Sequence, residues 1–439
     1  MADLLILNAD VLQDNAEVLH GHDILINGRR IEAVQPTGQA DPSQFKQVIR
    51  AEGRLAMPGL INTHAHVPMV LFRGLAEDVS IDRWFNEYIW PLEHNLQPDD
   101  VYWGMLLGLA EMIEAGVTTV ADHYFHMELA AQAVEKAGAR ALLGWAVFGS
   151  NGIGALERTT GFALEYNDSA EGRITTILAP HAPYTCDDDF LRASARLAMK
   201  HGLGIHIHVS ETKDQTEASL EKYGRTPIQT LEETGVLDVP TILAHVCGAM
   251  DGDIALLSRT QAGIAHAPKT YLKLAMDIAP VTAFREAGIP VGLATDGAVS
   301  NNTLDIWEAL RLTAMMQKDR AGNPEVLTIP EALHIATRDS ARVLRLEGEI
   351  GALLPGYLAD IILVDLGGLH HQPLYNVGAS LVYNARASDV QTVIINGQVV
   401  MRDRELLTLD KAEILAQVRA RAPRLSRRSA DQRIQTYEP

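Results

Sequence analysis

Two histidines separated by one residue follow a short apolar run, in Thr63-His64-Ala65-His66. In an extended strand, residues i and i+2 point to the same side, so both imidazoles would face one point. Imidazole nitrogens are common zinc ligands, and three protein ligands plus a water form a typical catalytic zinc site. The pair therefore predicts a metal site that needs further ligands from elsewhere in the chain.

Two later stretches and one histidine have the residue types that would complete such a site. His208 ends an apolar run and can be a third ligand, while Glu211 lies three residues later and can reach the reacting water without binding the metal. Asp296 ends another run and can both bind a metal and accept a proton from water. His245 also ends an apolar run, and it can either bind the metal or hydrogen-bond to the reacting oxygen.

The predicted site residues share one place in the local pattern, at or just after the end of a short apolar run that precedes a helix-compatible stretch. Eight such runs fall at 60–66, 117–122, 141–147, 174–181, 204–209, 241–245, 262–266 and 291–296. Eight repeats of strand and helix are typical of a closed (β/α)8 barrel of the TIM type, whose active site lies at the carboxyl ends of the strands. Further polar residues fall at the same ends, namely Asp122, His123, His181, His206 and His266. Because packing alone does not explain this gathering, we predict an α/β fold with such a barrel rather than an open doubly wound sheet.

The two ends of the chain have a different, strand-rich pattern. Apolar or alternating runs occur near 4–7, 23–34, 359–365 and 390–400, and Asn-Gly pairs at 27–28 and 396–397 indicate hairpin turns. We expect both ends to pair into one small β-sandwich domain, made of residues 1–58 and 346–439, beside a barrel of residues 59–345. The second part also contains a terminal helix from Lys411 on, basic near residues 424–428, which is predicted to face solvent or another subunit.

The composition limits the partners and the compartment. The 439 residues include 56 acidic and 37 basic side chains, and the net charge of −19 disfavours nucleic acid and anionic membranes as partners. The two cysteines, Cys186 and Cys247, make neither a disulfide framework nor a CxxC zinc site, and they fit the cytoplasm. No run approaches the roughly 20 apolar residues of a membrane span, and the first residues do not resemble a signal peptide. We therefore expect a cytoplasmic protein.

Longer motifs around these residues resemble the amidohydrolase superfamily. They are Met57-Pro58-Gly59-Leu60-Ile61-Asn62-Thr63-His64-Ala65-His66, His208-Val209-Ser210-Glu211, His245 and Thr295-Asp296-Gly297-Ala298-Val299-Ser300-Asn301-Asn302. Within the superfamily, the chain is most similar to the deaminases of S-adenosylhomocysteine and 5′-methylthioadenosine, close to the chlorotriazine hydrolases. That similarity rests on residues 73–78, Trp84, Pro91-Leu92-Glu93, 122–126 and 180–185. The resemblance covers nearly the whole chain.

The resemblance implies a zinc-dependent hydrolytic deaminase. It assigns the metal to His64, His66, His208 and Asp296, and the catalytic work to Glu211, His245 and Asp296. Two-metal relatives bridge their ions with a modified lysine at the end of strand four, where this chain has no lysine, so a single zinc ion is implied. Substrate contacts are implied for Glu93 to ribose hydroxyls, Trp84 and His181 to the base, and Glu211. Relatives are commonly dimers or tetramers, so a homo-oligomer is expected.

Two departures from the family pattern bear on the substrate. The usual Asn-Pro-x-Ser-Asn-Leu-Lys-Leu run after strand seven reads Ala-Pro-Lys-Thr-Tyr-Leu-Lys-Leu here, at residues 267–274. An arginine that some members have near the end of strand three is replaced by Trp145, which leaves Arg158 to serve the ribose or amino-acid end. We predict that the small-molecule substrate is a purine-type, adenosine-derived heterocycle that loses ammonia. The alternative activities are a triazine dechlorinase or aminohydrolase, or a guanine, cytosine or pterin deaminase. The alternative to zinc is another divalent metal ion.

Overall fold

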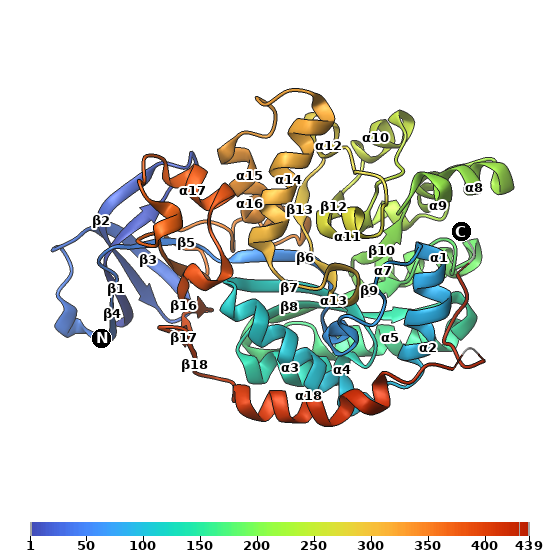
Figure 1. Ribbon diagram of the computed structural model, residues 1–439, viewed down its shortest axis with the longest axis horizontal. Helices are drawn as coiled ribbons and strands as arrows, with labels where there is room; N and C mark the ends of the chain where they lie inside the picture. The colour runs from blue at the N-terminus through green and yellow to red at the C-terminus, as the bar shows by residue number, and fades with distance from the viewer. Residues whose placement is uncertain (1, 430, 438–439) are drawn as a thin grey trace.

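The computed structural model describes residues 2–429 and 431–437, which form a barrel with a smaller β domain at one end (Figure 1). Over these residues the barrel sheet has the order β13-β12-β11-β10-β9-β8-β7-β6-β14, with parallel neighbours. Its strands are β6 (Leu60–His66), β7 (Val117–Tyr124), β8 (Arg140–Val147), β9 (Ile174–Pro180), β10 (Ile205–Val209), β11 (Thr241–His245), β12 (Ala262–His266), β13 (Val291–Leu293) and β14 (Asp296–Gly297). The predicted barrel is confirmed.

The eighth barrel strand, predicted as one run over 291–296, is divided into two pieces. β13 pairs with β12 and β14 pairs with β6, so the two pieces together close the barrel. Between them, the side chain of Asn62 takes the place of a neighbouring strand, since its Oδ1 accepts from the Thr295 N–H at 3.1 Å and its Nδ2 donates to Thr295 Oγ1 at 2.7 Å. Asp296, the first residue of β14, has a φ of 59°, in the left-handed region that non-glycine residues rarely adopt.

Helices that alternate with the strands cover the outside of the barrel (Figure 1). They are α3 (Pro98–Glu114), α4 (Met127–Ala137), α5 (Ile153–Tyr166), α7 (Asp188–His201), α8 (Lys213–Tyr223), α9 (Pro227–Glu233), α10 (Asp251–Leu257), α11 (Pro268–Lys273), α12 (Val281–Glu286), α14 (Ile306–Ala321), α15 (Ile329–Ala336) and α16 (Arg338–Val343). Their ends follow local signals. α7 begins after Asp187, whose side chain accepts from the Phe190 N–H, and it ends at Gly202 with a φ of 67°. Among the described residues, no helix has the length and apolar character needed to cross a membrane.

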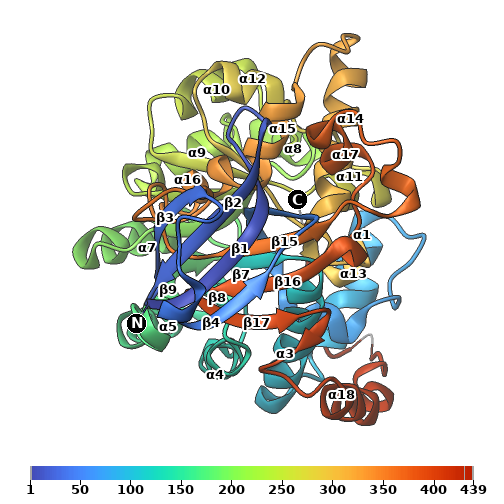
Figure 2. The ribbon, with the colours of Figure 1, turned by 90° about the vertical axis from the view of Figure 1, so that its left-hand side faces the viewer.

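The smaller domain is a mixed sheet built from both ends of the chain, as predicted (Figure 2). Within the described residues its order is β18-β17-β16-β15-β5-β1-β2-β3, with β4 beside β1. The strands are β1 (Ala2–Leu12), β2 (Val18–Asn27), β3 (Arg30–Pro36), β4 (Phe45–Arg50), β5 (Arg54–Pro58), β15 (Ile361–Asp365), β16 (Val390–Ile395), β17 (Gln398–Arg402) and β18 (Glu405–Leu406). β5 joins the two halves by pairing with β15, and Ile6, Ile24, Ile361 and Ile394 lie in a buried core of this domain.

The two Asn-Gly pairs behave differently. Asn396 and Gly397 form the predicted two-residue turn, with φ values of 55° and 79°, between β16 and β17. In the first hairpin, Asn27 pairs with Arg30, so the turn consists of Gly28 and Arg29 and lies one residue later than predicted. The Asp3 carboxylate holds this register because it accepts from the Gly28 N–H at 2.7 Å.

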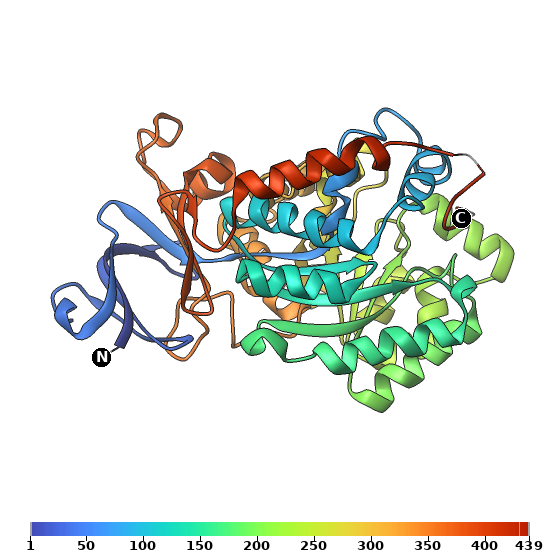
Figure 3. The same cartoon turned by 90° about the horizontal axis from the view of Figure 1, so that it is seen from below.

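The helix near the end of the chain, α18 (Lys411–Leu425), lies along α3, so the prediction of a solvent-facing or subunit-facing helix was wrong for one of its faces (Figure 3). Arg424 donates to both carboxylate oxygens of the buried Asp100, at 2.5 and 2.7 Å, and Arg421 lies over the Trp103 ring at 5.6 Å. Arg421 and Arg424 therefore bind aromatic and acidic groups on α3. After α18 the chain continues toward the end of the barrel that lies away from the β domain (Figures 1 and 3).

Candidate metal and substrate site

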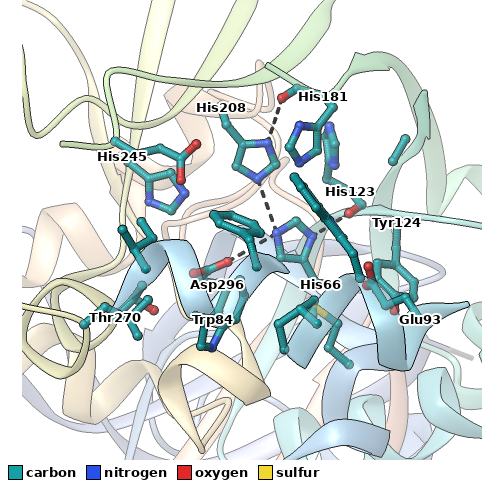
Figure 4. A pocket seen from close by; sticks show the side chains of 18 of the residues that line it. His66, Trp84, Glu93, His123, Tyr124, His181, His208, His245, Thr270 and Asp296 are labelled. Carbon is teal, nitrogen blue, oxygen red and sulfur yellow. Dashed lines mark hydrogen bonds and ion pairs between the residues drawn. The ribbon is translucent and has the colours of Figure 1, made fainter. Parts of the chain in front are cut away.

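Three histidines and one aspartate converge at the carboxyl end of the barrel, and Figure 4 shows three of these four residues, His66, His208 and Asp296. His64 and His66 come from β6, His208 from β10 and Asp296 from β14. The Nε2 atom of His66 lies 3.3 Å from Nε2 of His208 and 3.3 Å from Oδ1 of Asp296. The Nε2 atom of His64 lies 3.6 Å from the same aspartate oxygen. The structure thus brings together the four residues that were predicted to bind a metal.

The hydrogen bonds of two of these histidines show that the cluster fits a cation. His66 Nδ1 lies 2.6 Å from the His123 carbonyl oxygen and His208 Nδ1 lies 2.8 Å from the His181 carbonyl oxygen. A carbonyl only accepts, so in the neutral rings each Nδ1 has the proton and each Nε2 has a lone pair. Metal binding requires both rings to be neutral, and in that state the two Nε2 lone pairs face each other at 3.3 Å and cannot form a hydrogen bond. Two nitrogens bound tetrahedrally to one zinc ion would lie roughly 3.3 Å apart, so the donors fit zinc.

Burial and the pairing of Asp296 with its neighbouring histidines together set the charges within the cluster. It lowers the pKa of His64 to about 4 and holds the pKa of His208 well below the ordinary value, so both rings are neutral and able to bind a metal. Burial would also lower the pKa of His66, but the Asp296 carboxylate raises it. For Asp296, burial is outweighed by the two neighbouring histidines, which hold its pKa well below the ordinary value. A buried anion among imidazole nitrogens is the environment that a divalent cation requires.

His206 supports His64 from outside the cluster. Its Nε2 lies 2.8 Å from Nδ1 of His64, and the whole His206 side chain is buried. His206 is two residues from His208 on β10, so both side chains point to the same face of the strand. Hydrogen bonds of this kind fix the orientation of a ligand ring and increase its basicity. The sequence pattern placed His206 at the barrel rim without giving it a role.

Replacing His206 by phenylalanine is expected to weaken metal binding about 10- to 100-fold, the usual effect of removing a group that orients a ligand. His206→Gln keeps a hydrogen-bond acceptor, so it should bind the metal more tightly than the phenylalanine variant. Competition with a chromophoric chelator measures both affinities. If His206→Phe binds zinc as tightly as the unmodified protein, the supporting role of His206 is wrong.

Glu211 and His245 lie beside the cluster with unused polar atoms. Glu211 Oε1 and His245 Nδ1 are buried and have no hydrogen-bond partner among the described residues. Burial, assisted by the charge of Asp296, raises the pKa of Glu211 to about 7. Burial lowers the pKa of His245 to about 3, so its ring is neutral. Buried groups without partners in a polar site are available to a ligand.

The backbone is strained at three of these strand ends. Ser210, His245 and Asp296 have φ values of 47°, 79° and 59°, which non-glycine residues rarely adopt. Such conformations persist where surrounding structure enforces them, and they are concentrated at functional sites. Ser210 follows β10, His245 ends β11 and Asp296 begins β14, so the strain coincides with the rim that holds the cluster.

A mainly apolar cavity adjoins the cluster, and four predicted substrate residues line it, namely Glu211 and the Trp84, Glu93 and His181 labelled in Figure 4. Trp84 begins a π-helical turn (Trp84–Ile89), and Glu93 ends α2 (Trp90–Glu93). Other lining residues include Phe85, Trp90, Phe125, Phe148 and Tyr184. The Glu93 carboxylate accepts a hydrogen bond from the Tyr124 hydroxyl at 2.7 Å, and burial raises its pKa to about 7. The indole N–H of Trp84 is buried without a hydrogen-bond partner among the described residues.

Arg158 lies apart from this inner cavity. It is exposed on α5 and lines a neighbouring outer cavity of about 410 Å³, together with Trp145. The two cavities share Glu93, Phe125, Ala146 and Phe148 as lining residues. Glu93 therefore stands between the metal-binding end and the side that contains Arg158.

Only some residues of the altered segment after β12, residues 267–274, line the inner cavity. Its lysines form ion pairs, Lys269 with Glu308 at 2.7 Å and Lys273 with Glu77 at 2.8 Å. Thr270 and Leu274 line the cavity instead. Leu274 is the leucine of the usual run, so the altered residue that reaches the cavity is Thr270, which replaces a serine and keeps the hydroxyl.

A (β/α)8 barrel with histidines and an aspartate converging at the carboxyl ends of its strands defines a metal-dependent hydrolase. The sequence model of the Amidohydrolase family matches residues 55–400, and the chain belongs to this family. It is a hydrolytic enzyme that acts on carbon–nitrogen bonds.

Relatives extend over the whole length of the chain. A protein of Pelotomaculum thermopropionicum named 5-methylthioadenosine/S-adenosylhomocysteine deaminase is 44% identical over 434 residues, which is 98% of this chain and 100% of that protein. A protein of Moorella thermoacetica with the same name is 42% identical over 96% of this chain and 99% of its own length. Among solved structures, a zinc-bound adenosine deaminase of Xanthomonas campestris has a TM-score of 0.91 and 31% identity, with coverage of 97% and 98%. The zinc-bound atrazine chlorohydrolase TrzN of Arthrobacter aurescens has a TM-score of 0.86 and 26% identity, with coverage of 96% and 100%.

Proposed function

We propose that the chain is a zinc-dependent deaminase of adenosine-derived nucleosides, of the class of 5′-methylthioadenosine and S-adenosylhomocysteine. The observation that carries this proposal is the place of Glu93. Its buried carboxylate lies between the inner cavity, next to the metal-binding cluster, and the outer cavity. A carboxylate there can accept hydrogen bonds from the ribose hydroxyls while the base extends toward the cluster and the 5′ substituent toward Arg158. A triazine has no such hydroxyls, so this arrangement favours a nucleoside.

In this proposal His64, His66, His208 and Asp296 hold one zinc ion. A zinc ion held there would lower the pKa of a water molecule toward neutrality and so would supply the nucleophile for hydrolysis. The proposal for zinc rather than another divalent ion rests on the nitrogen-rich donor set and on the 3.3 Å separation of two of the donors. Metal analysis of protein purified without added zinc tests the identity and the stoichiometry of one ion per chain.

The remaining residues move the protons and hold the reacting oxygen. Glu211 accepts a proton from the attacking water and donates it to the ring nitrogen beside the carbon that bears the amine. Asp296 and His245 hydrogen-bond to the attacking oxygen, and His245 stabilises the charge that develops on it. Asp296 accepts the second proton of the water and passes it to the departing amine, so that ammonia leaves and a ring carbonyl remains as the new carbon–oxygen bond replaces the carbon–nitrogen bond.

Three side chains orient the substrate in this proposal, with Trp84 packed on the base, His181 beside the ring and Arg158 at the 5′ end. Trp84 and His181 line the inner cavity and Arg158 the outer one. The indole N–H of Trp84, buried without a partner among the described residues, can donate to a bound substrate. Trp84 thus offers both an apolar face and a polar contact.

Glu93→Gln is expected to raise KM for adenosine-type substrates about 10- to 100-fold, because it removes charged hydrogen bonds to the ribose and keeps the size of the side chain. The effect should be much smaller with a 2′,3′-dideoxynucleoside, which lacks the hydroxyls. Steady-state kinetics with both substrates measures the difference. An equal rise in KM for both nucleosides would show that Glu93 does not bind the ribose hydroxyls.

We also propose that the enzyme is a cytoplasmic homo-oligomer. Cys186 and Cys247 are buried thiols, which suits a reducing compartment. Sedimentation of the purified protein tests the assembly state, and fractionation of cells that express it tests the compartment.

A further inference from the structure

Residues 431–437, which we call the strap, follow α18 in the chain and end at Tyr437, which contacts Phe85 and Tyr184 of the substrate cavity. The backbone of Tyr437 is held on both sides by the Asn86 side chain. Its N–H donates to Asn86 Oδ1 at 2.8 Å, and its carbonyl accepts from Asn86 Nδ2 at 3.2 Å. The Ser150 hydroxyl donates to Gln435 Oε1 at 3.3 Å. Just before the strap, the Arg428 guanidinium lies 4.0 Å from the centre of the Tyr88 ring.

The Tyr437 ring is buried between two residues that line the inner cavity. It is 5% exposed, and it stacks on Phe85 with 4.9 Å between ring centres and an interplanar angle of 13°. Its edge meets Tyr184 with 5.3 Å between centres and an angle of 75°. Phe85 belongs to the π-helical turn after α1 (Ile81–Arg83), and Tyr184 follows β9. The ring therefore joins two cavity walls that are about a hundred residues apart in the chain.

The Tyr437 hydroxyl connects to Glu211 through one residue. Gln215 Nε2 donates to the Tyr437 hydroxyl at 3.1 Å, and Gln215 Oε1 accepts from the Glu211 N–H at 2.9 Å. Gln215 and Tyr437 are both buried, so water does not replace either bond readily. Losing the hydroxyl would leave the buried Gln215 amide without this acceptor and free its side chain to turn.

We propose that Tyr437 is a positioning residue whose ring holds residues 81–93 over the substrate and whose hydroxyl, through Gln215, fixes Glu211. The two parts of the side chain thus act on different steps. The ring acts on substrate binding, since Trp84 and Glu93 lie in the segment that it holds. The hydroxyl acts on turnover, since Glu211 moves the proton.

Two substitutions separate these actions, and this kinetic comparison rests on the proposed function. Tyr437→Phe keeps the ring, so we expect kcat for adenosine-type substrates to fall about threefold to tenfold, the range for one neutral hydrogen bond, with KM within about twofold. Tyr437→Ala also removes the ring, so KM should rise at least about tenfold. Tyr375→Phe, at a tyrosine that is 92% exposed, is the matched control and should change neither constant. Unchanged kcat in Tyr437→Phe, or unchanged KM in Tyr437→Ala, would overturn the respective part.

Hydrogen–deuterium exchange tests the strap independently of any substrate. In the full-length zinc-loaded protein, Tyr437→Ala should increase exchange in residues 81–93 and leave the barrel strands unchanged, which also confirms that the variant is folded. Asn86→Ala, which removes the two backbone bonds to Tyr437 and retains the ring, should increase exchange in the same segment. Tyr437→Phe should match the unmodified protein there. If exchange of residues 81–93 is the same in Tyr437→Ala as in the unmodified protein, the strap does not hold the wall, whatever the enzyme deaminates.

Discussion

Replacing Glu211 by glutamine is expected to lower kcat about 10²- to 10⁴-fold while the protein keeps its metal, because the amide has the same shape but cannot accept and return a proton. Glu211 has a buried carboxylate oxygen that has no hydrogen-bond partner among the described residues, beside the metal-binding cluster. Steady-state ammonia release, with metal content measured on the same preparation, gives both quantities. Substrate binding should change much less than turnover.

The matched control for this experiment is Glu217→Gln. Glu217 lies on the exposed side of α8, six residues after Glu211, so its loss of charge should leave kcat unchanged. Near-normal turnover by Glu211→Gln would contradict the assignment of the proton transfer to Glu211. Loss of the metal together with turnover would instead place Glu211 among the metal ligands.

The second large effect is expected for His64→Ala, which should lose metal and activity together. His64 is fully buried, and its Nε2 faces Asp296 within the cluster. Without this nitrogen the donor set is reduced to three and no ring replaces it. We expect less than about a tenth of the zinc content after dialysis, and activity reduced by about 10³-fold or more. The buried His206 would also lose its partner, so a thermal melt should accompany the metal analysis.

His20→Ala provides the control, since His20 is an exposed histidine of β2 in the small domain. It should retain both zinc and activity. Full activity of His64→Ala with stoichiometric zinc would show that His64 is not a ligand. Full zinc with no activity would give His64 a role in catalysis alone.

The fold and the reacting cluster could be predicted because they depend on local patterns. A strand presents alternate residues to one side, so the spacing of His64 and His66 predicted that both rings face the same point. The barrel brings the carboxyl ends of all its strands to one rim, which predicted that the distant ligands would meet there. The pairing of the two chain ends followed from similar strand patterns in both. These features need no knowledge of which distant side chains meet.

The parts that could not be predicted depend on contacts between distant residues. The break before Asp296 is held by the Asn62 side chain, which replaces a strand-to-strand bond. The basic residues of α18 suggested a free surface, but Arg424 pairs with the buried Asp100. Tyr437 contacts the cavity wall because the chain runs toward that end of the barrel after α18. The residues around Tyr437 show no sequence pattern that would predict this contact. In the sequence, Gln215 is likewise indistinguishable from the other polar residues of α8.

Ammonia release from a panel of heterocycles by zinc-loaded protein distinguishes a nucleoside deaminase from the alternative enzymes. The panel contains adenosine, 5′-methylthioadenosine, S-adenosylhomocysteine, guanine, cytosine, a pterin, an aminotriazine and a chlorotriazine, with chloride release followed for the last. We expect the highest kcat/KM for an adenosine-derived nucleoside, and loss of that activity in Glu211→Gln and after zinc removal. Faster turnover of a triazine, a pterin or a free base than of every nucleoside in the panel would contradict this expectation.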